Sequence, residues 1–439
     1  MSARKMILLT LAVLVPGGLV ILALRCVFRS NFGERLLKGD ITMKRLGAVS
    51  ASLLAVGMLL LAACPNVVAQ NSSGKKPAKA QKSWKAAVKV DAKGHYDTNT
   101  FLLSDGQRTR LQAATPDDQI SGRYKDMNRV HDYIFTPSVK FLAEGPGAGG
   151  RKLGLEAGLN YDMYFLNPRR RHFNIDLAAE QNTSRNGRAR IKFEYTPSYF
   201  YRNYLADATN YTTSVLPSER VYKPDVYSQW DISVDYRHRL VGGKAALLAR
   251  GGYLQRRNQA PFVGHDRNAP HMGGGVDFGM TKWWRVDGNY DLALVDSPRV
   301  QEVTILNEPD FGVDFNNDGN TSDLSIRTVQ FVDRRHREHL FRASTKLGIR
   351  EKSYVEFGFE RRHRDFLSKE PFDVFHNGRT DNRDTFHVAF VSHLNDSLQF
   401  TTGYNYIFEN SNRPNDPGVV GEVNDYKRGV GFVGLSYRF

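Results

Sequence analysis

Cysteine is scarce in this chain of 439 residues, which holds only Cys26 and Cys64. Because no thiol follows Cys64, a disulfide framework and a cysteine-ligated metal site are excluded from the rest of the chain. Long apolar runs are also missing there. From residue 86 onward, none approaches the roughly 18 residues that a transmembrane helix needs. A structure that crosses a membrane with helices is therefore excluded for residues 86–439.

Acidic residues are few at the start of the chain, and this imbalance accounts for most of the formal net charge of +15. Residues 1–69 hold eight Lys and Arg against two acidic residues, and residues 70–85 hold five Lys and no acid. Only about +4 remains for residues 86–439. A nucleic-acid surface needs a concentrated basic face on the folded part, so we expect no nucleic-acid partner.

Residues 43–69 have the pattern of a signal peptide, with Lys44 and Arg45 before an apolar stretch and small residues before Gln70. We expect cleavage after Ala69, although Cys64 leaves lipoprotein processing as an alternative. Residues 1–42 contain a second apolar segment, which we interpret as an over-extended reading frame before a true start at Met43. An inner-membrane anchor is the alternative. The lysine-rich residues 70–85 are then a periplasmic linker.

Residues 86–439 show repeated two-residue alternation, which predicts β-strands. In "KLGLEAGLNYDMYF", for example, Leu153, Leu155 and Leu159 share one face, while Glu156 and Asn160 share the other. Such segments can be placed at 84–101, 130–143, 151–165, 171–182, 187–200, 225–240, 243–257, 270–281, 283–296, 336–350, 352–366, 383–394, 397–410 and 425–439. Their lengths suit strands that cross a bilayer.

The connections between these segments alternate in length. Most links after an even-numbered segment are short, such as "VGG" at 241–243, whereas most links after an odd-numbered one are long. Short turns at one end, long loops at the other and an even strand number are typical of outer-membrane barrels. A closed sheet also satisfies every backbone polar group in lipid. We therefore predict an all-β transmembrane antiparallel up-and-down β-barrel of about 14 strands, with 16 as an alternative, behind a helical N-terminal leader.

Two short motifs carry a resemblance to known proteins. The final segment "GVGFVGLSYRF", with Tyr437 and a terminal Phe439, resembles the signal that the barrel-assembly machinery recognises in outer-membrane proteins. Upstream, "HYDTNTF" at 95–101 resembles the aromatic-Asp-x-Asn opening of β-barrel porin families. The resemblance implies an outer-membrane location, with membrane lipid and the assembly machinery as partners, and a role in transport.

The same alternation turns charged side chains of both signs toward the barrel interior. The predicted lumen-lining residues are Arg188, Arg190, Lys192, Glu194, Asp231, Asp235, Arg237, Arg239, Arg285, Asp287, Arg342, Lys346, Glu356, Glu360 and Arg362. Such a lumen suits a porin-like channel for passive passage of small polar solutes, with a mild preference for anions. Alternatively, these charges pair across strands and only keep the inner wall hydrated.

Two other functions fit the same fold. One is a barrel that exports an exopolysaccharide, with a periplasmic partner near the lysine-rich linker. The other is a structural or adhesive barrel whose long loops bind ligands outside the cell. We find no catalytic set of residues in the sequence and expect no enzymatic activity.

The loop "VDFNNDGNTSDLS" is the one candidate for a cofactor site. Its oxygen-bearing residues Asp314, Asn316, Asp318 and Asp323 follow the first half of a calcium loop. Ser325 stands where the bidentate Glu of such a loop is expected, so a plain acidic surface loop is the alternative. A structural Ca²⁺ is thus the only cofactor that the sequence suggests.

Overall fold

A computed structural model describes residues 84–113, 124–205, 222–240, 244–306, 326–370, 373, 376–412 and 425–439. The predicted leader, signal peptide and most of the linker lie outside these described residues, as do Asp314, Asn316, Asp318 and Asp323. Within the described residues, no helix has the length and apolar character needed to span a membrane.

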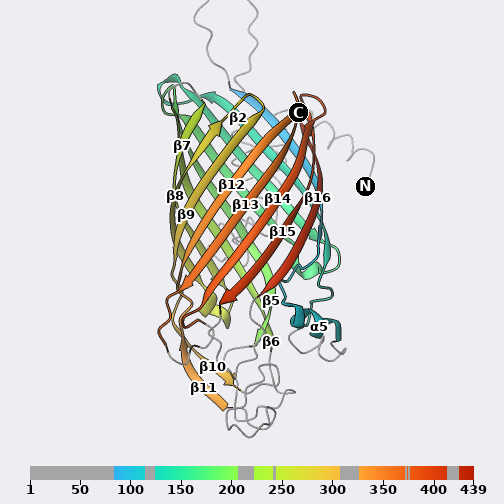
Figure 1. Ribbon diagram of the computed structural model, residues 1–439, viewed down its shortest axis with the longest axis vertical. Coiled ribbons are helices and arrows are strands. Elements are labelled where there is room, and N and C mark those ends of the chain that lie inside the picture. Colours follow the sequence, from blue (N-terminus) through green and yellow to red (C-terminus); the bar gives the residue numbers. More distant parts are fainter. Residues whose placement is uncertain are drawn as a thin grey trace, which may run out of the picture.

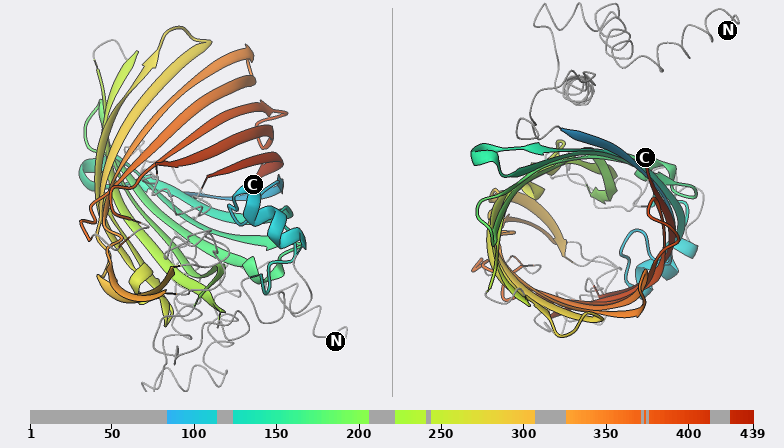
Figure 2. Two further views of the ribbon diagram at one scale, coloured as in Figure 1. Left: turned by 60° about the horizontal axis from the view of Figure 1, so that its bottom comes forward. Right: turned by 90° about the horizontal axis from the view of Figure 1, so that it is seen from above.

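Fourteen antiparallel strands form one closed ring, seen from its end in Figure 2 and from its side in Figure 1. The strands are β1 (Lys85–Asp97), β2 (Asp132–Pro146), β3 (Lys152–Tyr164), β4 (His172–Asn182), β5 (Gly187–Leu205), β6 (Tyr222–Arg239), β7 (Ala245–Asn258), β8 (Arg267–Gly279), β9 (Trp284–Val295), β12 (His336–Arg350), β13 (Ser353–Phe366), β14 (Thr380–His393), β15 (Leu398–Asn412) and β16 (Tyr426–Arg438). The predicted all-β barrel of 14 strands is confirmed.

The largest difference from the predicted elements lies between β9 and β12. This connection was expected to be a loop, but it contains a separate two-stranded hairpin of β10 (Val300–Leu306) and β11 (Ile326–Val332). A short helix, α5 (Asp105–Ala113), lies in the connection between β1 and β2. Three short 3₁₀ turns, η1 (Ala148–Gly150), η2 (Pro168–Arg170) and η5 (Phe262–His265), occupy other connections.

The outer face of the wall carries apolar side chains that no other part of the described protein covers. Leu159 is 51% exposed, Met272 63% and Val234 48%, and each points outward from the middle part of its strand. A closed barrel pairs its backbone polar groups within the sheet, so the wall can lie in lipid without unpaired groups. Its apolar outer surface is likewise stable in lipid and unfavourable in water. This is the architecture of an outer-membrane β-barrel.

The barrel closes between β1 and β16, the first and last strands of the ring. Asp97, which is fully buried, accepts hydrogen bonds from the Arg428 guanidinium, with the shortest contact at 2.7 Å. Asp97 also accepts from the backbone N–H of Asn99, and the Asn99 side-chain amide donates to the carbonyl of Lys427 at 3.1 Å. The Asp-x-Asn motif thus joins the two ends of the sheet.

Short and long connections lie at opposite ends of the barrel (Figure 1). The link at 165–171 is short although it lies at the long-loop end. Buried Asp132 explains it, because its carboxylate accepts the backbone N–H groups of Phe165, Leu166 and Asn167 at 2.9–3.0 Å. One carboxylate that binds three successive N–H groups holds the chain in a tight turn.

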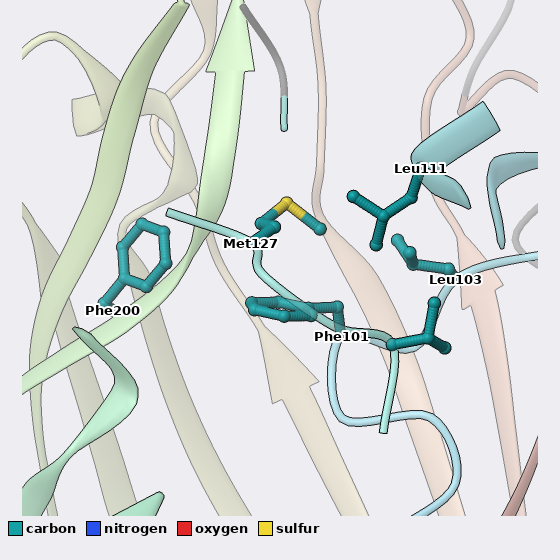
Figure 3. Packing of buried hydrophobic residues seen from close by; sticks show 6 residues of the cluster. Phe101, Leu103, Leu111, Met127 and Phe200 are labelled. Atoms are coloured by element: carbon teal, nitrogen blue, oxygen red, sulfur yellow. The ribbon is translucent and has the colours of Figure 1, made fainter. Parts of the chain in front are cut away.

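The long-loop end has a hydrophobic core of its own, formed by the segment between β1 and β2. Phe101, Leu103, Leu111 and Met127 are buried and pack with Phe200 of β5 (Figure 3). Arg170, which is 3% exposed, stacks over the ring of Phe101 at 4.8 Å. We call the described residues 98–113 and 124–131 the rim segment.

Candidate functional site

A cavity of about 870 Å³, which we call the main cavity, lies inside the barrel. Inward-facing side chains of β3 to β9, β12 and β13 line it, together with Lys140 of β2. Most of these side chains are charged, because the alternation that turns apolar residues toward lipid turns their neighbours inward. The cavity is therefore a polar lumen that can hold water and small hydrophilic solutes.

The predicted lumen-lining residues fall into three groups. Those that line the main cavity are Arg190, Lys192, Glu194, Asp231, Asp235, Arg342 and Arg362. Those that line a smaller cavity of about 210 Å³ at the short-turn end are Arg188, Arg237 and Arg239. The remaining five, Arg285, Asp287, Lys346, Glu356 and Glu360, line neither cavity but contact inward-facing partners on adjacent strands.

Most of the charges in the main cavity are paired across strands. Arg342 contacts Asp291 at 2.8 Å and Glu360 at 3.0 Å, and Arg250 contacts Asp235 at 2.6 Å. Arg190 contacts Glu156 at 3.1 Å. For many individual residues, these contacts support the alternative stated in the sequence analysis. In that alternative, the charges pair across strands and only keep the inner wall hydrated.

A second group of paired charges occupies the side of the cavity nearer the long loops. Glu338 of β12 accepts from Arg364 of β13 at 2.9 Å and lies 3.8 Å from Arg362. Arg362 also contacts Glu409 of β15 at 3.5 Å. Three strands are thereby linked through their inward side chains.

Arg256 of β7 and Arg267 of β8 depart from this pattern and were not among the predicted site residues. Both line the main cavity, and they are direct partners in the strand register. Arg256 donates to the neutral amide of Gln229 at 2.8 and 3.0 Å and stacks over the Tyr227 ring at 4.0 Å. Within the described residues, neither arginine forms an ion pair with a carboxylate. The alternation in 243–257 places Arg256 inward, whereas Arg267 precedes the predicted segment 270–281, and only strand register shows that the two are neighbours.

The long-loop end also holds a polar cluster outside the membrane-spanning part of the strands. Arg335 donates to Asp333 at 2.7 and 2.9 Å, and this contact lowers the pKa of the Asp333 carboxyl below its ordinary value. The backbone N–H of Asp333 donates to Asp373 at 2.9 Å, and Asp373 contacts His376 at 2.8 Å. The cluster attaches the start of β12 to the connection between β13 and β14.

Two further sites were predicted from the sequence, an assembly signal at the end of the chain and a calcium-binding loop. Tyr437 and Phe439 are exposed at the outer face of the last strand, with their rings in an edge-to-face contact at 4.6 Å. Recognition of these residues by an assembly machinery stays a prediction. Among the described residues there is no group of three or more His, Cys, Asp or Glu side chains arranged to hold a metal ion. The calcium hypothesis concerns residues outside that part of the chain.

No family model matches this chain, and no curated protein matches its sequence. Its fold is similar to several solved outer-membrane structures. The outer membrane channel DcaP of Acinetobacter baumannii is 9% identical with a TM-score of 0.40, over 82% of this chain and 99% of that one. A bacterial polysaccharide outer membrane secretin is 12% identical with a TM-score of 0.38, over 80% and 98%. An anion-selective porin from Comamonas acidovorans is 10% identical with a TM-score of 0.33, over 82% and 100%. Similarity at this level carries no information on solute or partner.

Proposed function

We propose that this protein is an outer-membrane channel through which small polar solutes, preferably anions, diffuse passively. The observation that carries the proposal is the polar, charged cavity of about 870 Å³ inside a wall whose outer face is apolar. Eight-stranded barrels can be filled by their own side chains, whereas a wider ring leaves room for solutes. Diffusion down a gradient needs only this room and a polar lining, so we propose no enzymatic activity and no required cofactor.

The preference for anions rests on the distribution of charge in the lumen. Nine Lys and Arg side chains and seven carboxylates line the main cavity, which leaves an excess of positive charge, and Arg256 and Arg267 have no carboxylate within ion-pair distance among the described residues. In a confined lumen whose surrounding wall has a low dielectric constant, unpaired charge raises the local concentration of the opposite ion. Field from these two side chains therefore favours entry of anions.

Conductance of the purified protein in a planar lipid bilayer tests this proposal. We expect stepwise openings in KCl solution and, across a salt gradient, a reversal potential that indicates preference for Cl⁻ over K⁺. A protein that inserts into the bilayer but gives no ionic current would overturn the channel proposal and favour an adhesive barrel or a plugged polymer exporter.

A pair of adjacent substitutions links the current to the lumen. Ala178 lines the main cavity, while Ala179 is its neighbour on the opposite face of β4. Ala178→Trp fills part of the lumen and should lower the single-channel conductance, whereas Ala179→Trp adds an aromatic side chain toward lipid and should leave it unchanged. Equal conductance of the two variants would show that the current does not pass through this cavity.

A further inference from the structure

We propose that Arg256, Arg267 and His336 form a binding site for a small hydroxylated carboxylate inside the lumen. This inference rests on the proposed channel function for access of the solute, and it names the class of solute. The three side chains come from β7, β8 and β12, and all line the main cavity.

The first argument is the unusual position of the two arginines. Arg256 and Arg267 lie directly opposite each other on adjacent antiparallel strands. Like charges in this position are destabilising, and an anion between them would relieve the repulsion. The five other arginines of the cavity, Arg190, Arg250, Arg342, Arg362 and Arg364, each have a carboxylate within 4.0 Å. Arg256 and Arg267 are the exceptions among the described residues that line this cavity.

The second argument concerns the geometry that a carboxylate would meet. The guanidinium of Arg256 is held by Gln229 and by the face of Tyr227, which fixes its plane without neutralising its charge. Arg267 contributes a second fork of donors from the neighbouring strand. Planar guanidinium groups match the two oxygens of a carboxylate, and such charge-assisted contacts are among the strongest hydrogen bonds in proteins.

The third argument is a buried acceptor without a donor. His336 is 3% exposed, and its Nδ1 lies 2.9 Å from the carbonyl oxygen of Arg334. Nδ1–H therefore donates to that carbonyl, so Nε2 of the neutral ring carries a lone pair. Nε2 is buried and has no hydrogen-bond partner in the described protein. A hydroxyl group of the solute would satisfy this acceptor.

Strand register brings this acceptor to the same part of the wall as the arginines. His336 lies opposite Val295 of β9, and β9 is the strand next to β8, which carries Arg267. Asn268, the residue after Arg267, forms an isolated bridge with Asp296, the residue after Val295. The cavity thus offers positive charge on one strand pair and a neutral acceptor close by.

Calorimetric titration of the detergent-solubilised full-length protein with gluconate tests the site without any current measurement. We expect saturable binding of gluconate, weaker binding of acetate, which has the carboxylate but no hydroxyl groups, and no binding of glucose, which is uncharged. The variant Arg256→Gln/Arg267→Gln should lose gluconate affinity by at least about tenfold, since charge-assisted contacts are removed.

A matched control uses arginines at the other end of the lumen. Arg185 and Arg239 line the smaller cavity near the short turns, and among the described residues neither side chain has a carboxylate within ion-pair distance. Arg185→Gln/Arg239→Gln makes the same change in net charge and should retain gluconate affinity. Equal losses in both double variants would overturn the site, because they would show a general charge effect.

Two further outcomes separate the parts of the inference. His336→Gln retains an acceptor and should keep the preference for gluconate over acetate, whereas His336→Leu should lose it. A wild-type protein that binds acetate as tightly as gluconate would overturn the role of His336.

The binding site and the channel function can fail separately. Binding of gluconate by a barrel that conducts no ions would overturn the channel function and leave the site standing. Conductance without gluconate binding would overturn the site and leave the channel function standing.

Discussion

The barrel wall and the rim segment of this protein are held together by different kinds of interaction. The wall is periodic: its strands pair through the backbone, and its apolar side chains face lipid. The rim segment is aperiodic and has a small core in which Phe101 is fully buried. Because the backbone ladder of the wall closes on itself, we infer that the wall folds as one unit, whereas the rim segment can open locally.

The largest effect should come from a charge on the lipid face of the wall. Leu159 and Asn160 are neighbours on β3 that point outward and inward, and Asn160 donates to Asp176 at 3.4 Å. Leu159→Arg should destabilise the barrel by about 2–4 kcal/mol and reduce its assembly in the membrane. Asn160→Arg brings a positive charge to Asp176 and should be tolerated. Thermal unfolding in lipid vesicles measures both, and equal stabilities would contradict the assignment of the faces.

A smaller and more local effect is expected in the rim segment. Phe101→Ala removes a fully buried ring and leaves a cavity, which costs roughly 3 kcal/mol in a well-packed core. We expect hydrogen exchange to become faster in residues 98–113 and to stay unchanged in the strands. If the unfolding temperature of the whole barrel fell as far as in Leu159→Arg, the rim segment and the wall would be one cooperative unit.

The paired charges of the lumen allow a third test. Lys346 and Glu356 are direct partners across β12 and β13 and lie 3.2 Å apart. Removing both in Lys346→Gln/Glu356→Gln leaves the net charge unchanged, so the ratio of Cl⁻ to K⁺ permeability should remain near that of the wild type. Glu356→Gln alone leaves Lys346 unpaired and should raise the ratio. Reversal potentials measure the two changes, and an effect of the double variant as large as that of the single one would contradict the pairing.

The smallest effect concerns the polar cluster at the long-loop end. Because the contact with Arg335 lowers the folded-state pKa of Asp333, its stabilisation is present above the unfolded pKa of about 3.9 and is lost as the pH falls through the folded pKa. Arg335 is partly exposed, so Arg335→Gln should cost less than about 1 kcal/mol at pH 6. Unfolding at an acidic pH where Asp333 is protonated in both proteins should show no difference, and a persistent difference would exclude this ion pair as its source.

The wall could be predicted in detail because its physical constraints repeat along the chain. Residues facing lipid must be apolar, so the alternation in segments such as 151–165 located β3 to within a residue or two. The predicted span 187–200 ended too early, because β5 continues to Leu205 beyond the part where apolar alternation is required. The β10–β11 hairpin was missed for the same reason, since it lies outside the lipid-facing wall.

The site was only partly predictable. Alternation assigned inward positions such as Arg190 and Arg342, which line the main cavity. It could not show that Arg256 meets Arg267 without a carboxylate, because a contact across strands depends on register. Nor could it show that Nε2 of His336 lacks a donor, since "RRHRE" looks like solvated charge in the sequence.

Alone, the sequence determined the barrel, a strand number of about 14 and the face that most side chains of the wall present, because lipid outside and water inside impose a two-residue period on every strand. Tertiary structure alone decided which charges neutralise one another and which remain unpaired. Pairing depends on the register of neighbouring strands and on the approach of distant loops, and no local period in the chain records either of them.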